Sequence, residues 1–499
     1  MLSNRGSGIL LHPTSLPGMF GSGDLGADAY KFVDWLVSCG QSYWQLLPMS
    51  EVGPGNSPYK SSSAFAGSIL LIDPVELASH GWLSRNDLTT QLQFRNDRIS
   101  YTLLKPFRMK LLRRAAMNFF SGSNDKMHGE FQEFCDKESE WLRDYALFMT
   151  ISASQYWRDW SQWPKEFAQR NRQALNRMEK ACTDEIQFWK FCQWCFLRQW
   201  TQLKRYANQQ NIWIIGDMPI FVAYNSADVW SHQELFKLDE SGHPSAIAGV
   251  PPDYFSETGQ LWGNPLYSWN MHEQSDYAWW IARLRHALLQ ADVVRIDHFR
   301  GFVAYWEIPP VSANAITGKW QPGPGEKLFK AFEKALPHLP IIAEDLGFIT
   351  PDVLALRDQF KIPGMRILQF AFSNDDNHFL PHHYVKNTVA YTGTHDNDTT
   401  LGWWNNATQH EKAFALNYLA SDGEAVNWDM MRALSKSVAN TVIFPMQDVL
   451  GLTGDSRMNF PGHQTGYWEW RFRWEQIQPE HTGALNEMTS KNGRIKRHF

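Results

Sequence analysis

The sequence predicts a single (β/α)₈ TIM barrel of the α/β class with long helical and loop insertions, and two observations support this prediction. Eight short apolar runs recur along the 499 residues, and most of them precede a helical pattern, as buried parallel strands do. Each run also ends in polar residues, which is typical of strands whose carboxyl ends form the rim of a barrel. The runs are GILLHPTS, YWQLLPMS, IWIIGDMP, VVRIDHFR, PIIAEDLG, GMRILQFAF, TVAYTGTHD and TVIFPMQD.

The uneven spacing of these runs predicts two insertions in a barrel that occupies residues 1–499. Residues 50–210, between the second and third runs, should be mainly helical, with helices around 103–120, 141–160 and 184–208. Residues 221–291 follow the third run and carry VPPDYFSETGQLWGNPLY at 250–267, whose Gly, Pro and aromatic residues predict a loop. About fifty residues follow the eighth run, too few for a C-terminal β-sandwich.

Composition excludes several classes of protein. The 47 Lys and Arg against 52 Asp and Glu leave a formal net charge of −5, which argues against a nucleic-acid partner. No apolar stretch approaches the roughly 18 residues that span a bilayer, so no membrane partner is expected. Five cysteines are an odd number, and the apolar start is too short for a signal peptide, so we expect a cytoplasmic protein.

Three features are interpreted as structural. Cys192 and Cys195 form a CxxC motif inside an aromatic helical pattern, where packing explains them better than redox or metal chemistry. The basic residues at 491–498 are expected to form a short solvated tail. Asp345 and Asp398 also follow strands, where the simpler explanation of each is a helix N-cap without a catalytic role.

GSGDLG at 21–26 matches the dinucleotide-binding pattern G-x-G-x-x-G. In a Rossmann unit, however, the glycines follow the strand directly, whereas here Pro13, Pro17 and about nine residues separate them from the first run. The motif is therefore interpreted as a turn that leads into the first barrel helix. A nicotinamide-dependent oxidoreductase remains the alternative that this motif alone would support.

Acidic residues follow three of the predicted strands. Arg295 and Asp297 are two residues apart, so both side chains should point toward the barrel mouth, and the arginine should lower the pKa of Asp297. Glu344 ends the next strand, where a neighbouring carboxylate should raise its pKa. His395 and Asp396 come from a third strand end. Acids that converge in this way are used in glycosidic bond chemistry.

A divalent metal is the competing use of clustered acids, with His298 or His395 as further ligands. A structural ion pair is the simpler explanation of Arg295 with Asp297 alone. The arginine beside Asp297 would repel a metal ion, and three buried acids are costly unless they are paired or used. The sequence therefore predicts no metal and no cofactor.

At these motifs the chain resembles the 4-α-glucanotransferases, the amylomaltase or disproportionating-enzyme family of the α-amylase superfamily. The resemblance extends over nearly the whole length. Its motifs, in family order, are LLHPTSLPGMFGSGDLG, SPYKSSSAFAG, GDMPIFV, VPPDYFSETGQLWGNPLY, VRIDHFRGF, IIAEDLG, TGTHDNDT and RMNFPG.

The resemblance implies transfer of α-1,4-glucan segments from a malto-oligosaccharide, starch or glycogen chain to the 4-hydroxyl of another glucan or of glucose. It implies a retaining double displacement with Asp297 as nucleophile, Glu344 as general acid and base, and Asp396 binding and distorting the transferred glucose. The residues expected to bind substrate are Arg295, His395, Asp217, Tyr59, Ser57, His298, Tyr254, Phe255, Trp262 and Asn459. An α-glucan hydrolase of the same superfamily and a non-catalytic glucan-binding protein are the alternatives.

The 24 tryptophans are expected to divide between packing and sugar binding. Trp189, Trp194 and Trp200 lie in a helical pattern, where packing is a sufficient explanation. The tryptophans expected near the barrel mouth are Trp262, Trp44, Trp403 and Trp468.

Overall fold

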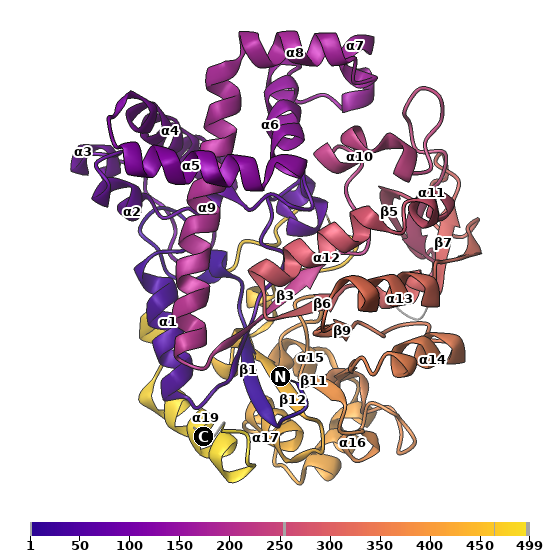
Figure 1. Cartoon of the computed structure of the whole chain (residues 1–499). Coiled ribbons are helices and arrows are strands. Elements are labelled where there is room, and N and C mark those ends of the chain that lie inside the picture. Colours follow the sequence, from indigo (N-terminus) through magenta and orange to yellow (C-terminus); the bar gives the residue numbers. More distant parts are fainter. Residues whose placement is uncertain (1, 253–255, 464, 496–499) are drawn as a thin grey trace.

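A computed structural model describes residues 2–252, 256–463 and 465–495. Eight parallel strands close into a barrel in the order β1-β12-β11-β10-β9-β6-β3-β2 (Figure 1). They are β1 (Gly6–Leu10), β2 (Tyr43–Gln45), β3 (Trp213–Met218), β6 (Val293–Ile296), β9 (Ile341–Ala343), β10 (Gly364–Ile367), β11 (Thr388–Tyr391) and β12 (Thr441–Pro445). Each strand overlaps one of the eight apolar runs, so the predicted fold class is confirmed.

Burial of the strands on both faces explains why they read as continuous apolar runs. Every residue of β1, β2, β6, β9, β11 and β12 is buried. Burying one large aliphatic side chain stabilises the fold by about 1.5–3 kcal/mol, and the barrel strands share one continuous core with the surrounding helices. The following helices complete the barrel: α1 (Ala27–Ser38), α12 (Ala278–Gln290), α13 (Glu326–Ala335), α14 (Pro351–Gln359), α15 (Thr400–Asn406), α16 (Gln409–Leu419), α17 (Val426–Lys436) and α19 (Pro479–Lys491).

The segment between β2 and β3 is mainly helical and forms the upper part of the molecule in Figure 1. Its long helix α9 (Thr183–Gln209) runs from this region down to the barrel and buries Trp189, Trp194 and Trp200. Cys192 and Cys195 are also fully buried in α9, where their role is packing. The other helices are α2 (Pro74–Ser79), α3 (Arg85–Leu88), α4 (Tyr101–Ser121), α5 (Asp125–Lys137), α6 (Ser139–Ser154), α7 (Lys165–Ala168) and α8 (Arg172–Ala181).

A second, antiparallel sheet lies beside the barrel in the order β5-β4-β7-β8. Its strands are β4 (Ile247–Val250), β5 (Gln260–Pro265), β7 (Ala304–Ile308) and β8 (Lys319–Pro322). The prediction that 250–267 is entirely loop is therefore wrong, because β5 occupies its second half. Two of the four strands come from residues before β6 and two from residues after it, so the central pairing of β4 with β7 is long-range and leaves no local pattern.

The glycines of GSGDLG form a turn that leads into α1, as predicted. A Cβ added at Gly23 would lie 2.0 Å from the carbonyl oxygen of Pro13, so only glycine allows the two backbone segments to approach. The motif does not connect a strand directly to a helix, because the 3-10 turn Pro13–Ser15 follows β1 first. The dinucleotide-site alternative therefore loses its structural basis.

The basic segment at 491–498 was expected to be solvated, and for Arg494 this prediction is wrong. The Arg494 side chain is buried and donates to five backbone carbonyl oxygens, at 2.9 to 3.4 Å. The acceptors belong to Gly6, Leu434, Ser435, Ser437 and Asn440. These carbonyls lie at the start of β1, at the end of α17 and just before β12, so the guanidinium joins three elements.

No β-sandwich follows β12 in the part of the chain that the structure describes. After β12 come α18 (Met446–Val449), an irregular segment and α19, which packs against α1 and α17. None of the described helices has the length and apolar character needed to cross a membrane.

Candidate active site

Arg295 joins two acidic side chains at the carboxyl-terminal rim of the barrel. β3 and β6 pair in register with Asp217 opposite Arg295. Arg295 donates from Nη1 to both carboxylate oxygens of Asp217, at 2.8 and 2.7 Å, and from Nη2 to Oδ1 of Asp297 at 2.9 Å. The Asp297 side chain is 27% exposed and Asp217 is 0% exposed, so only Asp297 is open to a ligand.

Tyr59 connects this ion pair to the end of β11. Its hydroxyl donates to Oδ2 of Asp217 at 2.7 Å and lies 2.8 Å from Nε2 of His395. The rings of Tyr59 and His395 stack with centroids 5.3 Å apart, and the ring of Trp468 packs against both. Ser57 accepts a hydrogen bond from the Tyr59 amide at 3.3 Å and caps the short 3-10 turn Pro58–Lys60.

Glu344 is held by two backbone amides beside Asp297. The amide of His298 donates to its Oε2 at 2.7 Å, and the amide of Leu346 donates to its Oε1 at 3.0 Å. His298 directly follows Asp297 and has a left-handed backbone, with φ +53°. A left-handed backbone is uncommon for a residue other than glycine and is often found at functional sites.

The ionisation of the two acids differs from the prediction for Asp297. Burial raises the pKa of Asp297, and Asp217, Glu344 and Asp396 raise it further, against the lowering effect of Arg295. The pKa of Glu344 is raised in the predicted direction, but burial is the main cause and the charge of Asp345 adds less. The predicted lowering for Asp297 is wrong because it considered only the nearest cation. Four carboxyl groups around one arginine favour retention of a shared proton.

Asp396 is oriented by a segment that lies far along the chain. Nδ2 of Asn459 donates to Oδ1 of Asp396 at 2.6 Å, and the Asn459 amide donates to the carbonyl of His395 at 3.0 Å. Arg457 donates to the backbone oxygens of both Asp396 and Asn459. The Asp396 carboxylate remains 40% exposed, so it is oriented yet open to a ligand.

Trp262 lies in β5, with its ring perpendicular to that of His298 at a centroid distance of 4.8 Å. The second sheet thus brings an aromatic ring to the residue that follows Asp297. Tyr254 and Phe255, which were expected to bind substrate from the same segment, lie outside the described residues.

The other tryptophans predicted near the mouth differ in position. Trp44 is fully buried, its indole N–H donates to the carbonyl of Leu11 at 2.8 Å, and its ring packs on Phe32 of α1. Its predicted role in stacking on sugar is therefore wrong. Trp403 packs on Phe372, whereas Trp468 contacts the Tyr59 and His395 rings.

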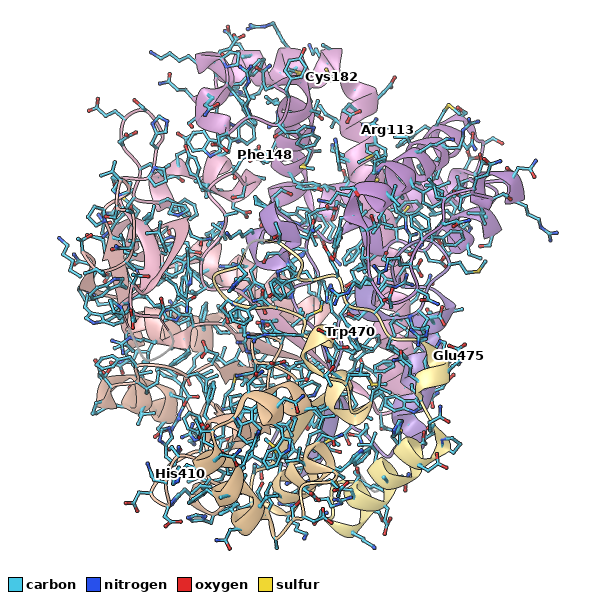
Figure 2. All side chains as sticks on the ribbon, turned by 180° about the vertical axis from the view of Figure 1, so that it is seen from behind. Arg113, Phe148, Cys182, His410, Trp470 and Glu475 are labelled. Carbon is cyan, nitrogen blue, oxygen red and sulfur yellow. The ribbon has the colours of Figure 1, made fainter. Side chains whose placement is uncertain are left out.

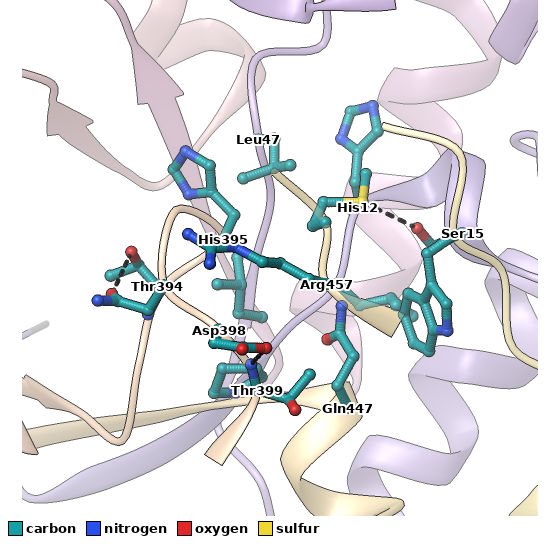
Figure 3. A pocket seen from close by; sticks show the side chains of 15 residues that line it. His12, Ser15, Leu47, Thr394, His395, Asp398, Thr399, Gln447 and Arg457 are labelled. Carbon is teal, nitrogen blue, oxygen red and sulfur yellow. Dashed lines mark hydrogen bonds between the residues drawn. The ribbon is translucent and has the colours of Figure 1, made fainter. Parts of the chain in front are cut away.

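A pocket of about 420 Å³, open space at its mouth included, lies beside His395 (Figure 3). His12, Gln447 and Arg457 line it together with Leu47 and His395, and Arg457 extends across it in the figure. Burial lowers the pKa of His12 to about 3, so this imidazole is neutral. The pocket thus presents polar groups next to the side chain of His395.

Asp345 does not join the acids at the rim. It is buried, binds Arg357 at 2.5 Å and accepts a hydrogen bond from the Met365 amide at 2.6 Å. Asp398 accepts from the Thr399 amide at the start of α15. Within residues 2–252, 256–463 and 465–495, no group of three or more His, Cys, Asp or Glu side chains is arranged to hold a metal ion.

Comparison with known proteins decides the family. A family model described as 4-alpha-glucanotransferase matches residues 11–478. This chain belongs to the 4-α-glucanotransferase family. The resemblance noted in the sequence is thereby confirmed.

Members of the 4-α-glucanotransferase family align with almost the whole chain. The 4-alpha-glucanotransferases of Thermus thermophilus and Synechocystis sp. are each 47% identical, over 98% and 99% of this chain and 99% of their own. Among solved structures, amylomaltase from Streptococcus agalactiae in complex with acarbose is 40% identical, covers 98% of this chain and 99% of its own, and superposes with a TM-score of 0.95.

Two side chains near the site of this 4-α-glucanotransferase family member, those of Arg457 and His12, were not predicted from the sequence. Arg457 was not singled out, although it lies in the family motif RMNFPG two residues before Asn459. His12 lies in LLHPTS and was likewise passed over. Both residues lie in motifs that carry the family resemblance, but nothing in either motif indicated a role for that particular residue.

Proposed function

We propose that this chain performs the glucanotransferase reaction of its family by a retaining double displacement, with Asp297 as the nucleophile and Glu344 as the general acid and base. One observation carries the assignment. Arg295 binds Asp297, and the amide of the next residue, His298, binds Glu344. This arrangement supports two carboxyl groups held side by side, as retention requires.

The charges around the pair favour retention of a proton there. Both pKa values are raised, so the pair retains a proton more readily than two isolated carboxyl groups. Arg295 acts against this at both acids, and two backbone amides also favour the ionised form of Glu344. We assign the shared proton to Glu344 because the retaining mechanism of the family needs a general acid there, and not because of these charges.

In the first step, an oxygen of Asp297 attacks the anomeric carbon while the bond from that carbon to the leaving oxygen breaks. Glu344 gives its proton to the leaving oxygen, and a glycosyl ester forms on Asp297. In the second step, the 4-hydroxyl of an acceptor gives its proton to Glu344 and attacks the same carbon. The ester bond breaks, and two inversions restore the α configuration.

The surrounding side chains are assigned to the glucose that is transferred. Asp396, with one oxygen held by Asn459, is proposed to bind and distort the ring, and His395 lies beside it. Tyr59 orients His395 through its hydroxyl. Asp217 is fully buried, so its proposed contribution is to position Arg295 and Tyr59 and not to touch the sugar.

The proposed donors are malto-oligosaccharides, starch or glycogen chains, and the proposed acceptors are the 4-hydroxyls of glucans and of glucose. The amylomaltase of Streptococcus agalactiae, solved with acarbose, supports an α-glucan ligand for this chain. Trp262 beside His298 offers an aromatic face to an acceptor ring. A cytoplasmic location remains a prediction.

Incubation with maltotriose tests the proposal. Transfer yields glucose together with oligosaccharides longer than maltotriose, whereas the hydrolase alternative yields only shorter products. Asp297→Ala should lower this activity by about 10⁴-fold or more with an unchanged thermal midpoint, because the residue is a partly exposed nucleophile. Shortening without any longer product would contradict transfer, and near-normal activity of Asp297→Ala would contradict the assignment of the nucleophile.

A further inference from the structure

Two adjacent aromatic residues, Tyr156 and Trp157, stand at the surface just after α6. Their exposed fractions are 84% and 57%. Neither belongs to the hydrophobic core of the described residues. Between residues 121 and 252, all of which the structure describes, Tyr156 and Trp157 are the only large hydrophobic residues that are exposed. Packing therefore does not explain why these positions are aromatic.

The backbone does not explain these residues either. Tyr156 and Trp157 both have left-handed backbones, with φ of +56° and +60°. The Tyr156 amide donates to the carbonyl of Ala153 at 3.3 Å and the Trp157 amide to that of Ser152 at 2.8 Å, which ends the helix. Glycine or asparagine is the usual choice at such positions, because a Cβ is unfavourable there. Two bulky rings occupy them against the local preference.

The segment that carries the two rings is fixed at both ends. The indole of Trp163 donates to the carbonyl of Arg158 at 3.1 Å, and Trp163 packs on Phe148, which is labelled near the top of Figure 2. The indole of Trp160 donates to the carbonyl of Tyr224 at 2.9 Å. Tyr224 belongs to the segment that follows β3, so the rings are held on the same body as the barrel.

The size and surroundings of the pair indicate its ligand. A stable protein interface buries about 800 Å² on each partner, whereas two aromatic side chains supply about 150–250 Å² each. The flanking residues Ser154, Arg158 and Asp159 are exposed and polar. Two apolar faces with hydrogen-bonding groups on both sides match two sugar rings and their hydroxyls.

We propose that Tyr156 and Trp157 form an aromatic platform that binds an α-1,4-glucan chain at a surface site separate from the catalytic rim. The identity of the glucan rests on the proposed function, since a polymer substrate extends beyond the groups that act on one bond. The platform retains long glucans and contributes nothing to the turnover of a trisaccharide.

Paired substitutions test the platform. In Tyr156→Gly/Trp157→Gly, glycine fits both left-handed positions, so the thermal midpoint should be equal to or above that of the unchanged protein. The apparent dissociation constant for glycogen, measured by retardation in native gels that contain glycogen, should rise about tenfold. The kcat/KM for maltotriose should stay within about twofold. The matched control Tyr156→Phe/Trp157→Phe keeps the ring faces and should retain glycogen binding.

Several results would overturn the platform. One is unchanged glycogen retardation in the glycine pair, and another is an equal loss of maltotriose turnover, which would place the rings in the fold or in the catalytic rim. Light scattering that finds a dimer for the unchanged protein and a monomer for the glycine pair would assign the rings to a protein interface. Gel retardation reports binding whether or not the enzyme turns over glycogen, so failure of the transferase proposal would be seen separately in the maltotriose assay.

Discussion

At Asp297, the charge state depends on the whole cluster and not on the nearest partner. Arg295 lies 2.9 Å away, yet burial and three neighbouring carboxyl groups outweigh it and raise the pKa. The sequence located both side chains correctly, because residues two apart on a strand point to one side. It also placed the neighbouring acids at the rim, but it did not show that burial and their charges outweigh the arginine, or that backbone amides hold Glu344.

The dependence of activity on pH follows from these raised pKa values. Transfer requires Asp297 ionised and Glu344 protonated, so kcat/KM should fall on the acid side as Asp297 binds a proton and on the alkaline side as Glu344 loses one. Because both pKa values are raised, both limbs of the pH profile, the fall on the acid side and the fall on the alkaline side, should lie at pH values above the pKa range of ordinary carboxyl groups. Measurement of kcat/KM for maltotriose against pH tests this.

The variant Glu344→Gln separates the two limbs. With an α-maltosyl fluoride donor, whose leaving group needs no proton, it should release about one fluoride per active site and then stop, because no base activates the acceptor. The rate of this burst should lack the alkaline limb. A burst that still falls at alkaline pH would assign that limb to another group.

Among the elements, the barrel strands were predictable and the second sheet was not. Strands buried on both faces are continuous apolar runs, which sequence alone reveals. The strands β5 and β8 are partly exposed, so no continuous apolar run marks them. The pairing of β4 with β7, which joins the two hairpins into one sheet, spans β6 and leaves no local signal. Trp44 was misplaced for a related reason, since its position in a short strand does not show which face it occupies.

The helix α11 (Trp269–Gln274) supports a prediction about stability. His272 is fully buried in it among the rings of Tyr267, Trp269 and Trp279, and burial lowers its pKa to about 4. Its value in the unfolded chain is about 6.5. Between these two values the unfolded chain binds a proton that the folded chain does not, so stability falls as the pH falls through this window, by about 1.4 kcal/mol per pH unit.

In His272→Leu this contribution disappears. The thermal midpoint of the unchanged protein should therefore drop more than that of the variant when the pH is lowered from about 7 to about 5. The other buried histidines remain in both proteins, so the difference isolates His272. Parallel loss of stability in the two proteins would contradict the prediction.

At the scale of the whole molecule, Arg494 secures the closure of the barrel. It binds carbonyls next to β1 and β12, the first and last barrel strands, which pair with each other. Burial lowers its pKa to about 9, which still leaves it charged near neutral pH. The expectation of a solvated tail was wrong because a run of basic residues is normally exposed. The carbonyl groups that accept from Arg494 lie far away in the sequence, so no neighbouring residue indicates them.

The variant Arg494→Ala should lose about 3 kcal/mol or more of unfolding free energy, because five carbonyl oxygens lose a charged donor. Its kcat/KM for maltotriose at 25 °C should be unchanged, since the residue is remote from the carboxyl-terminal rim. Chemical denaturation measures the loss, and Lys491→Ala, an exposed neighbour, serves as control. Equal stability of Arg494→Ala and the control would refute this role.

The contacts of Asn459 and Arg494 also set an order of events during synthesis. The ribosome has added all four acids of the rim once it reaches residue 396. It adds Asn459, whose side chain orients Asp396, 63 residues later. The guanidinium that joins β1 to β12 is made later still. A nascent chain thus carries all four acids before it has the side chain that aligns Asp396, so we expect catalytic competence only after residue 459 has been added.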